Sequence, residues 1–265
     1  MKGERIDKLL VDRGLAPSRT KAQALVMSGV VLVDEQLVNK PSETFAANAI
    51  IRLKGLDDAA AKYVGRGGLK LAAALREFHL DVSGLICLDV GASTGGFTDC
   101  LLQNGARKVV AVDVGHNQID WRLRNDPAVT VIERRNAREL TSEELPYRPD
   151  LVVADLSFIS LTKVLPTLLD ATAAQWDCVA LVKPQFEVGR ERVGKGGVVR
   201  GSEDRRAALI DIGQWAAQSG HTVLGYASSG LPGPAGNLES FIWIAENGRP
   251  GAVESIKEAA REVEP

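Results

Sequence analysis

The sequence predicts an α/β protein in which a small α+β domain precedes a large doubly wound sheet. Between residues 85 and 245, seven short apolar runs alternate with helical or loop segments, the pattern of an open sheet with helices on both faces. The first run ends in a glycine-rich turn that opens a helix, as in sheets that bind a ligand at their carboxyl edge. The N-terminal stretch instead holds two helical patterns and short extended runs. With 265 residues, each domain can have its own core.

Composition narrows the functional classes. Hydrophobic residues make up 45% of the chain and charged residues 25%, and the net charge of −2 argues against a general affinity for nucleic acid, although a local basic face remains compatible with it. No apolar run approaches the ~20 residues of a membrane span, so we expect a cytoplasmic protein. Cys87 and Cys178 lie in apolar runs, where we expect buried thiols without disulfides.

The N-terminal elements follow from helical spacing and turn residues. Apolar side chains recur at helical spacing over residues 5–13, and Gly14 ends that helix. A second helix is predicted over 18–27, with Ser18 as its cap. Residues 30–39 alternate around an Asp-Glu turn, and a further extended stretch ends at residues 50–53. The result is two short helices and a small curled sheet.

Several cationic side chains lie on or between these two helices, namely Arg5, Lys8, Arg13, Arg19 and Lys21. By itself such a set is more typical of a solvated helix face than of an RNA site. The order helix, basic helix, hairpin resembles the S4-type RNA-binding module over about residues 4–56, and this resemblance implies contacts to RNA backbone. We therefore predict an S4-like domain over 1–59, a linker over 60–66 and a second domain over 67–265.

The apolar runs of the second domain are its predicted strands. They span residues 85–91, 108–114, 129–133, 150–156, 178–184, 221–227 and 239–245. A loop without a helical pattern joins the last two, so we expect them to form a hairpin at the sheet's edge. The predicted architecture is a Rossmann-like sheet of seven strands.

The turn after the first strand has the features of a cofactor site. Asp89 precedes Gly91, Gly95 and Gly96, and glycines there would let a ligand approach backbone N–H groups. Asp113 ends the second strand 24 residues later, where a carboxylate can accept both hydroxyls of a ribose. Together these residues predict a site for an adenosine-type cofactor.

The spacing of this turn favours one class of cofactor. It is not G-x-G-x-x-G, and a carboxylate at Asp89 would repel a pyrophosphate but attract a cationic amino-acid tail. S-adenosylmethionine is therefore favoured over a nicotinamide dinucleotide, and a tight turn without a ligand is the remaining alternative. The predicted contacts on the turn are Asp89, Gly91, Ser93, Thr94, Gly95, Gly96, Phe97 and Thr98.

Four polar side chains form a candidate catalytic set. Asp155 and Lys183 end neighbouring predicted strands, and Asp155 can be the acid that a partly desolvated lysine needs. Lys70 and Glu239 each have an ordinary interpretation, as a surface helix lysine and as a charge at the start of a strand. Beside the glycine-rich turn, however, the ordered Lys-Asp-Lys-Glu set resembles the tetrad of FtsJ-like ribose 2′-O-methyltransferases.

Further motifs make the whole chain similar to the TlyA family of ribosomal RNA 2′-O-methyltransferases, also known as hemolysins. They are YVGRGGLK, GASTGGFTD, VDVGHNQIDWRLRND, ERRNAR, ADLSFIS, LVKPQFEVGRERVGKGGVVR and GNLE. The resemblance implies in-line attack of a ribose 2′-hydroxyl on the methyl group of S-adenosylmethionine. It implies Lys183 as the base that takes the hydroxyl proton and Asp155 as the group that orients Lys183 and the methyl donor. Lys70 and Glu239 would position the ribose.

The resemblance also implies contacts outside the tetrad. Asn136 is expected to contact adenine rather than only to cap a helix. Residues 189–200 are expected to form an RNA-contacting lid, with a mobile surface loop as the alternative. The predicted RNA contacts of this domain are Arg66, Arg190, Arg192, Lys195 and Arg200. The histidines, His79, His116 and His221, have no metal-binding spacing, and we predict no metal.

The expected partners are both ribosomal subunits. The family divides into a shorter type that acts on large-subunit RNA and a longer type, with extra helical segments at its ends, that acts on both. Residues 252–263 have helical spacing that indicates such a segment, although a plain terminal helix packed on the sheet is the alternative. We therefore expect methylation of a cytidine in the decoding region of the small subunit and of an interface hairpin in the large subunit.

Two other functions remain as hypotheses. The name hemolysin suggests a membrane-active protein, but the sequence offers no membrane span and no long cationic amphipathic helix. A non-catalytic ribosome-assembly factor could retain the cofactor turn, but no residue of the tetrad is missing. The sequence therefore favours an active enzyme.

Overall fold

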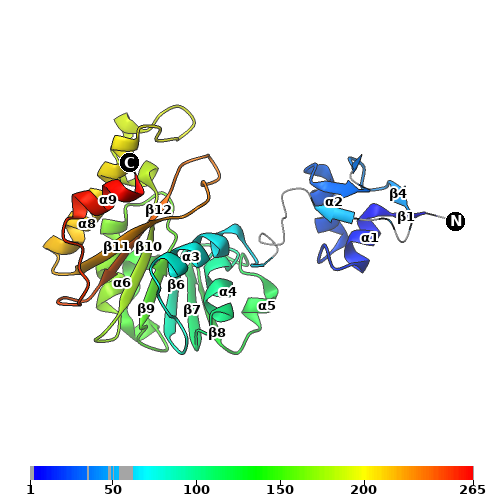
Figure 1. Cartoon of the computed structure of the whole chain (residues 1–265). Coiled ribbons are helices and arrows are strands. Elements are labelled where there is room, and N and C mark those ends of the chain that lie inside the picture. The colour runs from blue at the N-terminus through cyan, green and yellow to red at the C-terminus, as the bar shows by residue number, and fades with distance from the viewer. Residues whose placement is uncertain (1–2, 35, 47–48, 50, 54–61, 265) are drawn as a thin grey trace. The chain divides into compact units, whose positions relative to one another are not determined.

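The computed structural model describes residues 3–34, 36–46, 49, 51–53 and 62–264. The chain divides into two compact units, Met1–Lys62 and Tyr63–Pro265, which are described separately (Figure 1). The predicted linker begins at residues 60 and 61, outside the described residues, and its remaining part from Tyr63 onwards lies in the second unit. There Tyr63 is buried, and the backbone N–H of Val64 donates a hydrogen bond of 2.7 Å to Asp99.

The N-terminal unit contains the two predicted helices and the predicted hairpin. In chain order its elements are β1 (Glu4–Arg5), α1 (Ile6–Asp12), α2 (Arg19–Met27), β2 (Val31–Val33), β3 (Gln36–Leu37), β4 (Thr44–Phe45) and β5 (Ile51–Leu53). Ser18 caps α2 as predicted, accepting a hydrogen bond of 3.3 Å from the backbone N–H of Lys21. Strand β2 lies between β3 and β5, and both pairings are antiparallel. The short β1–β4 pair was not predicted, because two-residue strands have no pattern to detect.

The second unit is built on the predicted seven-stranded sheet. Its strands are β6 (Ile86–Val90), β7 (Lys108–Asp113), β8 (Val129–Glu133), β9 (Leu151–Ala154), β10 (Asp177–Val182), β11 (Thr222–Ser228) and β12 (Ser240–Ala245), in the order β11-β12-β10-β9-β6-β7-β8. Strands β6 to β10 are parallel to their neighbours within that group, whereas β12 is antiparallel to both β10 and β11. The last two strands thus form the predicted hairpin, with β11 at the edge.

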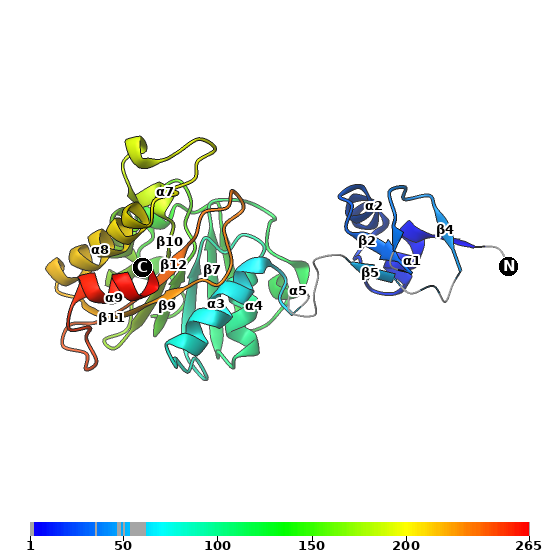
Figure 2. The ribbon, with the colours of Figure 1, turned by 45° about the horizontal axis from the view of Figure 1, so that its top comes forward.

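Helices cover both faces of this sheet (Figures 1 and 2). They are α3 (Arg66–Glu77), α4 (Gly96–Gln103), α5 (Trp121–Arg124), α6 (Leu165–Asp170), α7 (Pro184–Glu187), α8 (Ser202–Gln218) and α9 (Ile256–Val263). Side chains alternate between the faces: Cys87 of β6 packs with α3 and α4, whereas Leu88 packs with α6 and α8. Both faces are therefore dry, which explains the continuous apolar runs in the sequence.

The C-terminal helix is shorter than its sequence pattern indicates. The pattern begins at Ala252, but α9 begins at Ile256, after Ser255 accepts a hydrogen bond from the backbone N–H of Glu258. Val253 does not join the helix, because its N–H donates to the Val223 carbonyl of the edge strand β11 (3.0 Å). The helix packs on α8 and β11, as expected for a terminal helix that packs on the sheet.

The three cysteines of the chain all lie buried in the second unit. Cys87, Cys100 and Cys178 are buried free thiols, and burial raises the pKa of Cys87 and of Cys178 to about 12. These thiols are inert packing groups. Among the described residues, no helix combines the length and the apolarity needed to cross a membrane.

Candidate active site

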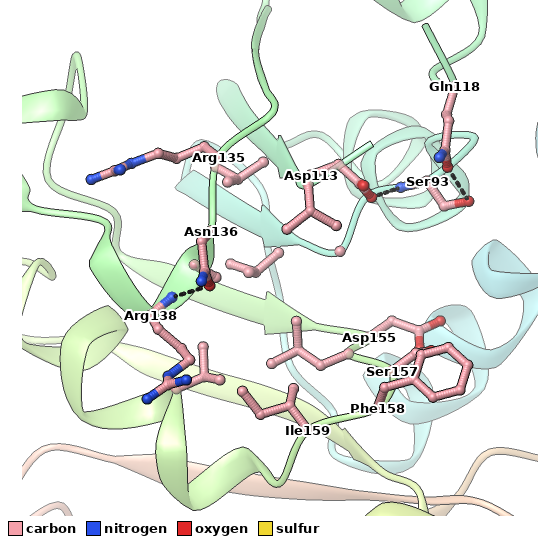
Figure 3. A pocket seen from close by; sticks show the side chains of 17 residues that line it. Ser93, Asp113, Gln118, Arg135, Asn136, Arg138, Asp155, Ser157, Phe158 and Ile159 are labelled. Carbon is pink, nitrogen blue, oxygen red and sulfur yellow. Dashed lines mark hydrogen bonds between the residues drawn. The ribbon is translucent and has the colours of Figure 1, made fainter. Parts of the chain in front are cut away.

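The predicted cofactor residues meet at the carboxyl edge of the parallel strands. A cavity of about 580 Å³ opens there, and its walls combine apolar side chains with the polar groups of Ser93, Asp113, Asn136 and Asp155 (Figure 3). Gly91 also lines it. The cavity lies where the strand order reverses, between β6 and β9. Open α/β sheets typically bind nucleotides at this point, in cavities of this size and composition.

Asp89 organises the glycine-rich turn from inside the protein. Its side chain is fully buried, and Oδ2 accepts hydrogen bonds from the N–H (2.9 Å) and the hydroxyl (2.6 Å) of Thr98 at the start of α4. Oδ1 is buried without a hydrogen-bond partner among the described residues. Burial, reinforced by the nearby Asp155 and Asp113, raises the pKa of Asp89 to about 7 against the opposing Thr98 hydrogen bonds. A cationic group of a ligand would satisfy this carboxylate.

The glycines of the turn serve close packing in addition to any ligand. A Cβ on Gly91, whose φ is +81°, would collide with the carbonyl oxygen of Asp155. A Cβ on Gly95 would collide with the side chain of Leu123, and one on Gly96 would lie 3.0 Å from the backbone nitrogen of Gly68. We expected glycine at these positions to make room for a ligand. The structure shows that neighbouring protein atoms, brought close by the fold, also require glycine there.

The other predicted turn contacts divide into two groups. Gly91, Ser93, Thr94, Gly96 and Phe97 line a small pocket of about 130 Å³ next to Asp155 and Gly67. Asp89, Gly95 and Thr98 line neither this pocket nor the main cavity. Thr98 is instead fully buried on Asp89, so its place in the structure is a support of the turn.

Asp113 and Asn136 both reach the main cavity, and both also bind backbone. Asp113 accepts hydrogen bonds from the N–H of Ser93 (2.7 Å) and of Gly115 (2.6 Å). Asn136 Oδ1 accepts from the N–H of Arg138 (3.1 Å), so this residue caps a helical turn as well as facing the cavity. Capping uses the amide oxygen of Asn136, so its amide nitrogen can still serve a ligand in the cavity.

The four candidate catalytic residues form two ion pairs. Lys183 Nζ lies 2.5 Å from Asp155 Oδ1 and donates a hydrogen bond of 3.1 Å to Ser157 Oγ. Lys70 Nζ donates to Glu239 Oε2, and both residues are buried, at 6% and 3% exposure. The surface-lysine interpretation of Lys70 is therefore wrong: α3 turns this side chain into the protein, where Glu239 compensates its charge.

A second cavity joins the two ion pairs. It has a volume of about 380 Å³, and Lys183, Glu239 and Asn237 are among its lining residues. Ser157 and Phe158 line both this cavity and the larger one. The segment after β9 therefore separates a cofactor-sized space from a second space that contains the ends of two tetrad side chains.

Phe158 on that segment was missed by the sequence analysis. Its side chain is 91% exposed, its φ is +64°, and its ring lies 5.1 Å from that of Phe186, centroid to centroid. Glu187 holds the following residues by accepting hydrogen bonds from Ser160 Oγ (2.6 Å) and the N–H of Leu161 (2.9 Å). The motif ADLSFIS contained the phenylalanine, but nothing in the sequence indicates that its backbone is left-handed and its ring exposed.

Asn237 holds residues near the C-terminal end of the predicted lid, and Arg192 lies 3.9 Å from Asp204 of α8. Asn237, which is 1% exposed, accepts a hydrogen bond from the N–H of Val199 (2.9 Å) and donates one to the Gly197 carbonyl (2.8 Å). Gly196 and Gly197 line the second cavity, as does Val193. The predicted RNA contacts Arg190, Arg192, Lys195 and Arg200 are exposed, as is Arg66. Their contact with RNA stays a prediction.

The predicted RNA contacts of the N-terminal unit are exposed, namely Arg5, Lys8, Arg13, Arg19 and Lys21. Lys8 lies between Glu4 and Asp12 (3.2 and 3.8 Å), and Arg13 donates a hydrogen bond of 2.6 Å to the Ala49 carbonyl. Arg5 and Arg19 share one buried carboxylate, which is considered below. Over the part of the chain that the structure describes, no group of three or more histidine, cysteine or acidic residues could hold a metal ion.

Family models match both units of the chain. Residues 63–246 match the FtsJ-like methyltransferase family, and residues 4–51 match the S4 domain. The 16S/23S rRNA (cytidine-2′-O)-methyltransferase TlyA of Mycobacterium tuberculosis is 48% identical over 240 residues, which cover 91% of this chain and 89% of that protein. The chain belongs to the TlyA family. The S4-like and FtsJ-like domains predicted from its motifs are thereby confirmed.

Other members of the TlyA family carry different names. The 23S rRNA (cytidine-2′-O)-methyltransferase TlyA of Campylobacter jejuni is 36% identical over 186 residues, which cover 70% of this chain and 72% of that protein. A solved structure from Streptococcus thermophilus, which carries the name hemolysin, is 40% identical, has a TM-score of 0.75 and covers 99% of this chain and 96% of its own. The name hemolysin thus occurs on proteins with the same fold as this member of the TlyA family.

Proposed function

We propose that this chain transfers a methyl group from S-adenosylmethionine to the ribose 2′-hydroxyl of a cytidine in ribosomal RNA. The observation that carries the proposal is the placement of the Lys183–Asp155 and Lys70–Glu239 pairs beside two adjoining cavities. One cavity has the lining of a nucleotide site, and the other is lined by Lys183 and Glu239, which we assign to the incoming ribose. We infer a cytoplasmic location from this proposed substrate.

The residues of the larger cavity fit S-adenosylmethionine. Asp113 would accept the ribose hydroxyls of the cofactor, and Asn136 would contact the adenine. Asp89 does not line the cavity, but its buried, unpartnered oxygen lies within the glycine-rich turn and suits a cationic amino-acid tail. When bound, the cofactor supplies the electrophilic methyl group. The apolar walls of the cavity exclude water, which strengthens each of these polar contacts.

Lys183 is the candidate general base. A hydroxyl is a poor nucleophile, so its proton must leave as the new bond forms. Lys183 is close enough to Asp155 to be oriented by it, and its side chain is only 13% exposed. Glu239, held by Lys70, would accept a hydrogen bond from the same ribose and keep it aligned.

The proposed substrates are both ribosomal subunits, recognised by the S4-like unit and by the cationic residues after α7. The Mycobacterium tuberculosis relative is named for both 16S and 23S rRNA, whereas the Campylobacter jejuni relative is named for 23S rRNA alone. The identity and the coverage are higher for the former, which supports the broader range.

Methylation mapping tests this function directly. Purified protein, S-adenosylmethionine and unmethylated subunits should yield 2′-O-methylcytidine in RNA of both subunits, located by mass spectrometry. Methylation of the large subunit alone would restrict the proposal, and the absence of methyl transfer would favour the non-catalytic assembly factor. Lysis of protein-free lipid vesicles by the pure protein would favour the membrane-active hypothesis instead.

Replacement of Asp113 by alanine should weaken S-adenosylmethionine binding about 10- to 100-fold, because a hydrogen bond to a charged group contributes roughly 1.5–3 kcal/mol. The variant also removes the acceptor of the Ser93 and Gly115 N–H groups, which loosens the turn, so the loss of affinity should be about 100-fold. Calorimetry measures the affinity. Glu133→Gln is the matched control, because Glu133 ends the adjacent strand in register with Asp113 but does not line the cavity. Unchanged affinity of the Asp113 variant would contradict the site.

Replacement of Asp89 by asparagine should stabilise the protein and weaken cofactor binding. The folded pKa of Asp89 is raised to about 7 from 3.8, so the folded state binds more protons between these values and stability falls as pH rises through that window. The variant carries no charge there, so its melting temperature should exceed that of the wild type by a few degrees at pH 8, and by less at pH 5. Thermal melts at both pH values measure this, and an equal difference at the two would contradict it.

Replacement of Phe158 by alanine should lower methyl transfer about 5- to 150-fold if its ring stacks on the target base, because stacking on an aromatic side chain is worth ~1–3 kcal/mol. An enzyme that reacts within a folded RNA must expose the target nucleotide, and a 91% exposed ring between the two cavities suits that base. Phe158→Trp should retain activity, and Phe158→Leu should not. Cofactor affinity measured by calorimetry should change little in all three. Equal activity of the leucine and tryptophan variants would argue against stacking.

A further inference from the structure

Asp7 in the N-terminal unit is a buried carboxylate with cationic partners at the surface. The residue is 0% exposed and lies in the first turn of α1. Arg5 donates to it twice, from Nε to Oδ1 (3.0 Å) and from Nη2 to Oδ2 (2.9 Å). Oδ2 also accepts hydrogen bonds from Arg19 Nη2 (3.1 Å) and Gln23 Nε2 (3.0 Å). One carboxylate thus joins β1, α1 and α2.

The two arginines remain open to solvent. Their side chains are 45% and 58% exposed, although the carboxylate between them is covered. The Arg5 and Arg19 hydrogen bonds hold the pKa of Asp7 well below its usual range against the opposing effect of burial. Asp7 is therefore ionised, and the three groups together present a net positive charge with two guanidinium groups fixed side by side.

Lys8, the cationic side chain within α1, lacks this arrangement. Lys8 pairs with Glu4 and Asp12, whose side chains are themselves 39% and 50% exposed. Exposed pairs of this kind are weak and leave both partners mobile. Lys8 is thus held by solvated acids, whereas Arg5 and Arg19 are held by a buried one.

We infer that Asp7 positions Arg5 and Arg19 as a preorganised guanidinium pair that binds backbone phosphate of the RNA. This inference rests on the proposed function. Arginine presents a fork of N–H donors that matches phosphate, and Asp7 uses only part of that fork on each side chain. Ordering long side chains on binding costs entropy, and a pair that is ordered beforehand avoids much of that cost.

The direction in which Asp7→Asn changes RNA affinity distinguishes a positioning role from a simple effect of charge. Asp7→Asn removes a negative charge next to the proposed phosphate site, so electrostatics alone predicts tighter RNA binding. Positioning predicts weaker binding, because a neutral amide cannot hold two guanidinium groups. Arg5→Lys keeps the positive charge but loses the two-point contact with Asp7, and it leaves Arg19 and Gln23 on the carboxylate.

The experiment measures binding of the full chain to purified unmethylated large ribosomal subunits over a series of KCl concentrations. We expect Asp7→Asn to weaken binding about tenfold and Arg5→Lys several-fold, with a shallower dependence of log K on log [KCl]. Lys40→Arg, the control at an exposed lysine of the same unit outside the predicted RNA contacts, should bind as the wild type does. Affinity for S-adenosylmethionine should be unchanged throughout, because that site belongs to the other unit.

The outcomes are distinguishable. Hydrogen exchange of α1 and α2 reports whether the Asp7→Asn variant remains folded. If it does not, the subunit affinity of the Arg5→Lys variant tests the inference instead. Tighter or unchanged binding by folded Asp7→Asn, or wild-type binding by Arg5→Lys, overturns the inference while the proposed function stands. A wild-type chain that neither binds nor methylates the subunits overturns both.

Discussion

Replacement of Lys183 by alanine is expected to slow methyl transfer about 10²- to 10⁴-fold while S-adenosylmethionine binds nearly as well as before. This is the usual value of a positioned general base, and Lys183 is paired with Asp155 at the boundary of the second cavity rather than in the lining of the larger one. Single-turnover transfer to unmethylated subunits, with calorimetry for the cofactor, measures both quantities. A variant that keeps more than about a tenth of the rate would refute the role.

Arginine at the same position separates proton transfer from charge. Lys183→Arg keeps a cation beside Asp155, but a guanidinium does not lose its proton at neutral pH. It should therefore be about as slow as the alanine variant. Lys163, an exposed lysine near the same edge that lines neither cavity, provides the control, and Lys163→Ala should be as active as the wild type. An active arginine variant would show that Lys183 supplies charge and not basicity.

Deletion of residues 1–62 is expected to leave a folded, cofactor-binding protein that methylates subunits at least about 100-fold more slowly at limiting concentration. The second unit has its own core on both faces of the sheet and contains all four tetrad residues. Phosphate contacts supply much of the affinity of RNA-binding proteins, and the S4-like unit carries five of the predicted cationic contacts. Transfer rates against subunit concentration measure the effect.

The deletion should raise the KM for subunits and leave the maximal rate much less affected. The truncation begins at Tyr63 because this side chain is buried in the second unit, and a cut beyond it would expose that core. Equal cofactor affinity in the full and truncated chains serves as the folding control. Equal methylation at low subunit concentration would show that the N-terminal unit is not the RNA-binding element.

Local patterns predicted most of the secondary structure but not its exact limits. The seven strands, the Ser18 cap and the terminal hairpin depend on the period of apolar residues and on turn residues, which are visible in a single sequence. The C-terminal helix was predicted too long, since Val253 hydrogen-bonds to β11 and not within a helix. Pairing with a distant strand does not change the local pattern, so periodicity cannot detect it.

The candidate site shows the same division. The sequence alone determined the chemical inventory: a carboxylate before a glycine-rich turn, a second carboxylate one strand later, and an ordered set of two lysines and two acids. Only the tertiary structure decided how these groups pair, because Lys70 and Glu239 are 169 positions apart and meet through the packing of α3 against the sheet. It alone exposed Phe158, and it placed Asp7 beneath two arginines. The physical reason is that burial and pairing depend on contacts between distant segments, whereas a sequence motif records only which side chains are available.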